Sequence, residues 1–163
     1  MKTRTLLLDN YDSFTFNLKH LLTSVNGREP IVVRNDELGW EELVGLGFDN
    51  VVISPGPGRP ERARDFGICR RVVLELEVPI LGVCLGHQGI AHFAGAEVVV
   101  APEPVHGRLS RIFHQGADLF AGLPQGFEAV RYHSLMVASS LPRCLDRLAW
   151  GIWGWTARRI SIS

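Results

Sequence analysis

The sequence has no excess of charge, no long apolar run and few cysteines. Its 163 residues include 17 basic and 17 acidic side chains, so the formal net charge is zero. This balance gives no electrostatic reason to bind nucleic acid or an anionic membrane. No apolar run approaches the roughly 18 residues of a membrane-spanning helix, and the apolar run near the N-terminus is too short for a signal peptide. We therefore expect a soluble, cytoplasmic protein that binds neither nucleic acid nor membranes.

Cysteine and glycine patterns exclude several kinds of site. Cys69, Cys84 and Cys144 are odd in number and lack metal-ligand spacing, so they predict neither a disulfide framework nor a zinc site. No Gly-x-Gly-x-x-Gly follows a predicted strand, and Gly45-Leu-Gly47 precedes one, so a dinucleotide fingerprint is absent. We expect no metal and no cofactor.

Short apolar runs alternate with helical patterns in the first half of the chain. This alternation predicts an α/β fold with an open, mostly parallel sheet and helices on both faces. In such sheets ligands bind at the carboxyl ends of the strands. Ser13 is the expected N-cap of the first helix, and Asn26-Gly27 its end. The predicted strands cover residues 5–8, 31–33, 50–54 and 80–83, and the predicted helices residues 14–22, 40–46 and about 64–77.

The second half has a different pattern. We expect a strand over residues 95–100, a loop over 102–107 and the start of a more antiparallel region over 108–113. A turn over 122–126 and a strand over 127–131 should follow. The histidines of this half are expected to be structural or surface residues rather than catalytic bases. They are His106, His114 and His133.

The stretch around Cys84 carries the main chemical prediction. An apolar run suited to a strand leads into Gly82-Val-Cys-Leu-Gly86, and a helical pattern follows. A nucleophile on a sharp strand-to-helix turn needs small residues two positions to either side, and Gly82 and Gly86 supply them. At a helix start the dipole would lower the thiol pKa, and backbone N–H groups could hold an oxyanion. The alternative is a buried structural cysteine beside a flexible turn.

A second stretch, Pro55-Gly-Pro-Gly58, directly follows the third predicted strand. It should therefore lie at the same sheet edge as Cys84. The prolines stiffen the loop, and a glycine N–H in it could point outward as an oxyanion donor. The alternative is an ordinary rigid turn.

Five blocks stand in order along the chain: Leu8-Asp-Asn-Tyr-Asp-Ser-Phe-Thr-Phe-Asn17, Ser54-Pro-Gly-Pro-Gly58, Gly82-Val-Cys-Leu-Gly-His-Gln88, Ala101-Pro-Glu-Pro-Val-His-Gly107 and Arg131-Tyr-His-Ser-Leu135. In this order and at this spacing they resemble blocks of the class I (triad-type) glutamine amidotransferases. The closer similarity is to the amidotransferase component of the synthases that make anthranilate or 4-amino-4-deoxychorismate from chorismate. It covers about residues 3 to 150, and Arg59 to Gly67 further resembles fused aminodeoxychorismate synthases. We expect an amidotransferase domain over residues 1–150 and a divergent tail over 151–163.

The resemblance implies a flavodoxin-like fold and a role for each matching residue. Cys84 matches the nucleophile that attacks the glutamine side-chain amide and forms a glutamyl thioester. Gly58 and Leu85 match the backbone donors of the oxyanion hole. Ammonia would pass through a protected route to a chorismate-binding synthase, as a separate subunit or a fused domain. The implied glutamine-binding residues are Gly56, Pro57, Gly58, Leu85, Gln88, Ser134 and Leu135.

The sequence departs from this family in one respect. It contains no His-Pro-Glu, the segment whose His accepts the thiol proton and whose Glu orients that His. The tail, with Trp150, Trp153 and Trp155 among glycines, looks unlike a helix or strand terminus. We expect a truncated or frame-shifted product, or a fragment of a longer fused gene. The last strands would then be missing, and an apolar sheet edge would be exposed.

Three hypotheses follow from these patterns. The first is an amidotransferase that feeds ammonia from glutamine to a chorismate-aminating partner. The second is a catalytically impaired remnant that binds a partner or glutamine without turnover. The third is a cofactor-binding flavodoxin-like module, disfavoured because no phosphate-cradling loop is visible.

Overall fold

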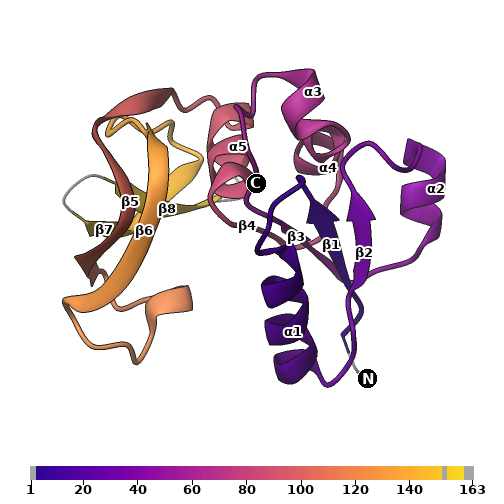
Figure 1. Ribbon diagram of the computed structural model, residues 1–163, viewed down its shortest axis with the longest axis horizontal. Helices are drawn as coiled ribbons and strands as arrows, with labels where there is room; N and C mark the ends of the chain where they lie inside the picture. Colours follow the sequence, from indigo (N-terminus) through magenta and orange to yellow (C-terminus); the bar gives the residue numbers. More distant parts are fainter. Residues whose placement is uncertain (1–2, 152–153, 160–163) are drawn as a thin grey trace. The chain divides into compact units, whose positions relative to one another are not determined.

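The structure, a computed structural model, describes residues 3–151 and 154–159, without the side chains of 104–106, 151 and 154–159 (Figure 1). The chain divides into two compact units, the first ending at Phe93 and the second beginning at Ala94. Within the described ranges, no helix has the length and apolar character needed to cross a membrane.

The first unit is built on a parallel four-stranded sheet in the order β2-β1-β3-β4. All its strand pairs are parallel, as predicted. The apolar side chains of the central strands are buried on both faces: Leu6 and Leu8 lie on one, and Leu7 on the other. Such two-sided burial accounts for the continuous apolar runs in the sequence. The strands are β1 (Thr5–Asp9), β2 (Ile31–Arg34), β3 (Asn50–Ile53) and β4 (Ile80–Gly82).

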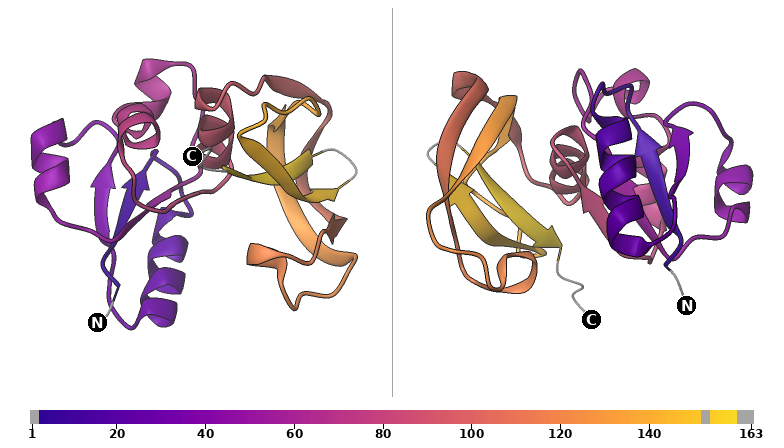
Figure 2. Two further views of the ribbon diagram at one scale, coloured as in Figure 1. Left: turned by 180° about the vertical axis from the view of Figure 1, so that it is seen from behind. Right: turned by 60° about the horizontal axis from the view of Figure 1, so that its bottom comes forward.

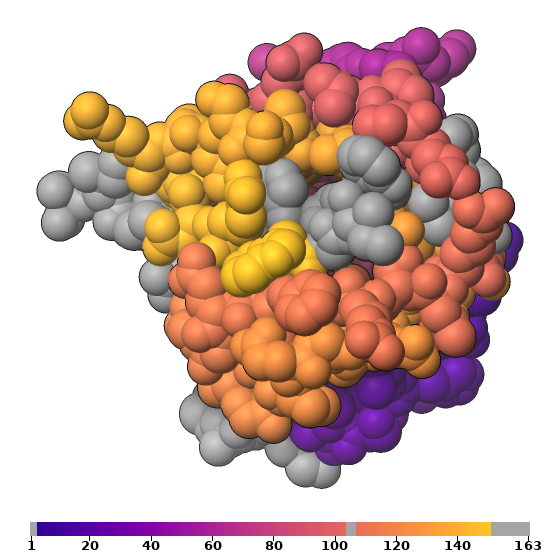
Figure 3. Space-filling model, turned by 90° about the vertical axis from the view of Figure 1, so that its left-hand side faces the viewer, coloured from indigo at the N-terminus to yellow at the C-terminus, as the bar shows by residue number. Residues whose placement is uncertain are grey.

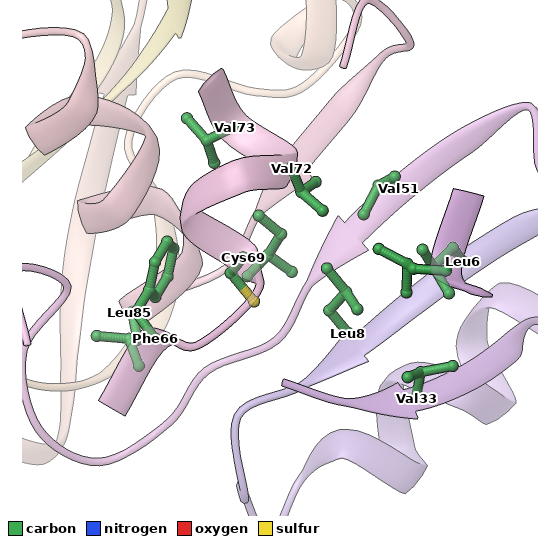
Figure 4. Packing of buried hydrophobic residues seen from close by; sticks show 11 residues of the cluster. Leu6, Leu8, Val33, Val51, Phe66, Cys69, Val72, Val73 and Leu85 are labelled. Atoms are coloured by element: carbon green, nitrogen blue, oxygen red, sulfur yellow. The ribbon is translucent and has the colours of Figure 1, made fainter. Parts of the chain in front are cut away.

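Helices complete the first unit. Buried side chains of α2 to α5 pack in one cluster with Leu6, Leu8 and Ile53 of the sheet, and Figure 4 shows several of them converging. No buried α1 residue belongs to this cluster, and α1 contacts β1. The prediction of a parallel sheet flanked by helices is confirmed. The helices are α1 (Thr15–Asn26), α2 (Trp40–Gly45), α3 (Ala63–Phe66), α4 (Cys69–Glu75) and α5 (Leu85–Phe93).

Two local predictions in this unit are wrong. The single helix expected over 64–77 is divided into α3 and α4 by Gly67, which has a φ of 46°. Gly67 packs against the backbone oxygen of Asn35, the residue after β2, and a side chain at Gly67 would overlap that oxygen. The break between α3 and α4 therefore lies beside the end of β2. Ser13 does not cap α1; the N-cap is Phe14, without a side-chain hydrogen bond. Gly27, in the left-handed region, ends α1 as expected.

The second unit is an antiparallel four-stranded sheet in the order β6-β5-β7-β8. Figure 2 shows β5 and β6 as a long curved pair, and Figure 3 shows one face of this unit in space-filling form. Its elements are β5 (Val98–His114), the 3-10 helix η1 (Asp118–Phe120), β6 (Phe127–Val137), β7 (Leu145–Gly151) and β8 (Gly154–Arg159).

The structure corrects two predictions in the second unit. The loop expected over 102–107 is part of β5. The pairing of β5 with β6 shifts its register between residues 100 and 105, where the prolines lie, and between 106 and 108, at Gly107. The end of the chain was expected to be unlike a strand, yet Trp150 pairs with Trp155, and Gly151 with Gly154, in β7 and β8. Residues 152–153 and 160–163 of the predicted divergent tail lie outside the described residues.

Candidate active site

Cys84 lies on a sharp turn between β4 and α5, as the glycine spacing predicts. Its φ is 52°, a left-handed conformation that is strained for any residue except glycine. A side chain at Gly82 would overlap the backbone of Gly86, and one at Gly86 would overlap the backbone oxygen of Ile53. Ile53 is fixed there because its oxygen accepts the Val83 N–H at 2.9 Å. The tight packing of the turn therefore depends on both glycines.

The Cys84 thiol is half-buried, and burial raises its pKa above the usual value. A hydrogen bond from the Leu85 N–H lowers the pKa, and the nearby Asp12 carboxylate raises it. The predicted lowering of the thiol pKa is therefore wrong in its net direction. The Leu85 N–H at the start of α5 does act in the expected sense, but loss of hydration outweighs it.

The raised pKa leads to a prediction about reactivity. We expect the rate of Cys84 alkylation by iodoacetamide to rise with pH beyond pH 9, because the reactive thiolate forms only as pH approaches the raised pKa. Cys69 is buried with a pKa of about 12, so it should stay unlabelled and serve as an internal reference. Mass spectrometry of peptides from samples quenched at each pH measures both rates. A plateau in Cys84 labelling below pH 8 would contradict this expectation.

An Asp12→Asn variant provides the matched control. The Asp12 carboxylate raises the pKa of Cys84, so its neutralisation should lower that pKa and speed labelling at pH 8. The amide oxygen of asparagine can still accept the Phe14 N–H that Asp12 Oδ1 accepts at 2.8 Å.

The Pro55–Gly58 segment follows β3 and packs against the start of α5. A side chain at Gly56 would come within 2.9 Å of Leu85 Cδ2 and within 2.6 Å of the Asn10 backbone oxygen. Gly58 is exposed and has a φ of 89°. The structure thus brings the loop and Leu85 together at the carboxyl edge of the parallel sheet.

The residues implied in glutamine binding fall in both units. Gly56, Pro57, Gly58, Leu85 and Gln88 lie in the first unit, where Gln88 is buried and donates its N–H to the Cys84 oxygen at 2.9 Å. The remaining two lie in β6 of the second unit, and their part in the site stays a prediction. They are Ser134 and Leu135, the latter paired with Val100 of β5.

The structure contains a buried polar network that the sequence analysis did not identify. Asn10, directly after β1, donates its backbone N–H to Ser54 Oγ at 2.9 Å and its Nδ2 to the Ser54 oxygen at 3.0 Å. Asn35, directly after β2, donates Nδ2 to Asn10 Oδ1 at 2.8 Å. All three residues are almost fully buried. Their signal in the sequence is a small polar residue immediately after each of three buried strands.

A sequence model of the family described as "Glutamine amidotransferase class-I" matches residues 6–153. The chain belongs to this family. Over 147 residues this amidotransferase is 58% identical to the aminodeoxychorismate synthase of Streptomyces griseus, a match that covers 90% of the chain and 20% of that protein. It is 54% identical to the chloroplastic aminodeoxychorismate synthase of Arabidopsis thaliana, covering 92% of the chain and 18% of that protein. The chain thus spans about a fifth of the length of these two relatives.

A shorter relative is covered more fully. Anthranilate synthase component 2 of Methanothermobacter marburgensis is 49% identical over 140 residues, which cover 83% of this amidotransferase and 71% of that protein. Among solved structures, a putative GMP synthase subunit from Thermoplasma acidophilum matches with a TM-score of 0.82 at 23% identity. That match covers 98% of the chain and 79% of that structure, and it shows the shared fold.

Proposed function

We propose that the chain releases ammonia from the side-chain amide of glutamine through a thioester on Cys84, and that the ammonia serves a chorismate-aminating synthase. The observation that carries the chemistry is the half-buried Cys84, held at a φ of 52° on the turn directly before α5. The synthase partner is supported by the relatives, which are aminodeoxychorismate synthases and an anthranilate synthase component 2. The resemblance of residues 59–67 to fused aminodeoxychorismate synthases favours that product.

The proposed reaction has two covalent steps. The Cys84 thiolate attacks the glutamine amide carbon, forming a C–S bond and a tetrahedral oxyanion. The C–N bond then breaks, the nitrogen takes a proton and leaves as ammonia, and a thioester remains. Water adds to the thioester carbon, the C–S bond breaks, and glutamate leaves with the thiol restored.

Backbone donors at the turn suit the oxyanion. The Leu85 N–H lowers the pKa of the Cys84 thiol, so it lies near enough to the sulfur to serve an oxygen on the carbon bound there. We assign the second donor to Gly58, on the loop that packs against Leu85 through Gly56. Loss of one such donor typically costs about 10²–10³-fold in rate.

A second candidate function is glutamine binding without turnover. It is favoured by the raised pKa of Cys84, which keeps the thiol protonated near neutral pH. A base that takes the thiol proton typically contributes about 10²–10⁴-fold. Formation of a covalent adduct therefore has to be measured separately from release of glutamate.

The test uses 6-diazo-5-oxo-L-norleucine, a glutamine-shaped diazoketone that alkylates a nucleophile after it has bound in a glutamine site. We expect one adduct, on Cys84, at a rate that saturates with reagent and falls when glutamine is added. Cys84→Ser should abolish the adduct, whereas Cys144→Ser, at the other half-buried cysteine, should leave it unchanged. Labelling that does not saturate, or that glutamine fails to slow, would overturn the proposal. Glutamate release by the unlabelled chain distinguishes turnover from binding alone.

A further inference from the structure

Asp65, on α3, holds the end of the Pro55–Gly58 loop. Its Oδ2 accepts the backbone N–H of Arg59 at 3.0 Å, and its side chain is 16% exposed. The same carboxylate fills the space that a side chain at Gly58 would occupy. The Asp65 carboxylate therefore contacts the peptide group between Gly58 and Arg59, at the end of the loop.

This contact constrains the Gly58 backbone. A peptide group is planar, so fixing the Arg59 N–H also fixes the plane of the bond between Gly58 and Arg59. Gly58 has a φ of 89°, and as glycine it could adopt many other conformations without steric cost. The Asp65 carboxylate therefore limits which way the Gly58 N–H points.

Asp65 is itself tied to the start of the loop. Asn35 Nδ2 donates to the Asp65 backbone oxygen at 3.0 Å and to Asn10 Oδ1 at 2.8 Å. Asn10 in turn holds Ser54, the residue before Pro55, through its backbone N–H and its Nδ2. One buried network thus fixes both ends of the loop, and a chain held at both ends retains little conformational freedom.

We propose that Asp65 is a positioning residue, whose carboxylate orients the Gly58 N–H toward the oxyanion formed on the carbon bound to Cys84. This inference rests on the proposed function. Asp65 would thus act on the oxyanion hole through Gly58, without itself contacting the oxyanion. A displacement of about 1 Å can cost about 10²-fold in rate, so a single hydrogen bond here can have a large effect.

The test compares two reagents on the same cysteine. In the glutamine site the ketone carbon of the diazoketone replaces the amide carbon, and addition of the thiolate to it gives a tetrahedral oxyanion. The diazo carbon takes a proton, the sulfur migrates to it as N2 leaves, and the carbonyl re-forms. Iodoacetamide instead alkylates sulfur by direct displacement of iodide and forms no oxyanion. For Asp65→Ala we expect the maximal diazoketone inactivation rate of Cys84 to fall about 10- to 100-fold, with little change in the half-saturating concentration. The iodoacetamide rate should stay within about twofold, because the thiol itself is unchanged.

Three further variants make the test specific. Asp65→Asn keeps an oxygen that can accept the Arg59 N–H, so its diazoketone rate should stay within about threefold of wild type. Asp65→Glu keeps the charge but moves the carboxylate, so its rate should fall about 3- to 30-fold. Glu61→Ala removes a nearby carboxylate that accepts from the Arg59 side chain at 3.4 Å rather than from the loop backbone, and it should change neither rate.

Each outcome bears on a distinct claim. Diazoketone rates that stay at the wild-type value in Asp65→Ala or Asp65→Glu would overturn the role of Asp65 and leave the proposed function standing. Equal losses with both reagents would also overturn it, because they would reflect a general disturbance of Cys84. If Asp65→Ala does not fold, as judged by circular dichroism, the Asp65→Glu and Asp65→Asn rates decide. If the wild-type chain gives no saturable adduct on Cys84, the proposed function itself fails.

Discussion

Replacement of Gly86 by alanine is expected to destabilise the first unit by about 3 kcal/mol or more and to abolish diazoketone labelling of Cys84. The added methyl group would overlap the backbone oxygen of Ile53 and lie 2.9 Å from its Cβ and Cγ2. Ile53 cannot move away easily, because it is fully buried in β3 and its oxygen accepts the Val83 N–H. The turn would have to open, and the Cys84 sulfur would move with it. Urea unfolding followed by circular dichroism measures the loss.

Gly45→Ala is the matched control for this substitution. Gly45 also lies in a helix, at the end of α2, but a side chain there would meet no atom within 4 Å. Because alanine has the higher helix propensity, this variant should be as stable as wild type or up to about 1 kcal/mol more stable. A Gly86→Ala protein with the stability of Gly45→Ala would show that the turn does not depend on close packing at Gly86.

Phe66→Ala is expected to lower the free energy of unfolding by about 3–5 kcal/mol. Phe66 is 1% exposed and is the largest fully buried side chain in the described chain. Its ring stacks on Phe93 of α5, with ring centroids 5.8 Å apart, and it fills the space above Gly89. Removing the ring leaves a cavity between α3 and α5, while Phe66→Leu should lose less because most of the volume is kept.

A double-mutant cycle checks that this contact is the cause. A side chain at Gly89 would overlap the Phe66 ring, so Gly89→Ala alone should be destabilising. In the Gly89→Ala/Phe66→Leu double variant, the smaller leucine leaves room for the added methyl group. The double variant should therefore lose about 1 kcal/mol less free energy of unfolding than the two single variants lose together. Strict additivity in urea unfolding would indicate that the two positions do not interact.

The sequence was most informative where one local pattern has one physical meaning. Apolar runs alternating with helical stretches predicted the parallel sheet, because strands buried on both faces must be apolar throughout. Gly82 and Gly86 around Cys84 predicted the sharp turn, since only glycine leaves room for the backbone contacts seen there.

Prediction failed where the deciding partner is distant in the chain. Asn10 donates a hydrogen bond to Ser54, 44 residues away, so the residues around Asn10 gave no indication of its partner. Gly67 breaks the expected helix because Asn35 lies against it. The pKa of Cys84 depends on burial by other segments, which a helix-dipole argument at one position leaves out. Prolines at 102 and 104 indicated a loop, yet both lie within β5, between the residues that pair with β6 at Val100 and Val105.

The buried hydrogen-bond network around Asn10 limits how early in synthesis the first unit can fold. Its partners, Asn35, Ser54 and Cys69, lie 25, 44 and 59 residues along the chain, so its hydrogen bonds cannot form until these segments have met. Contacts between such distant positions form slowly, because the intervening chain loses entropy before they stabilise it. During synthesis the Pro55–Gly58 loop should therefore stay unordered until α4 has left the ribosome.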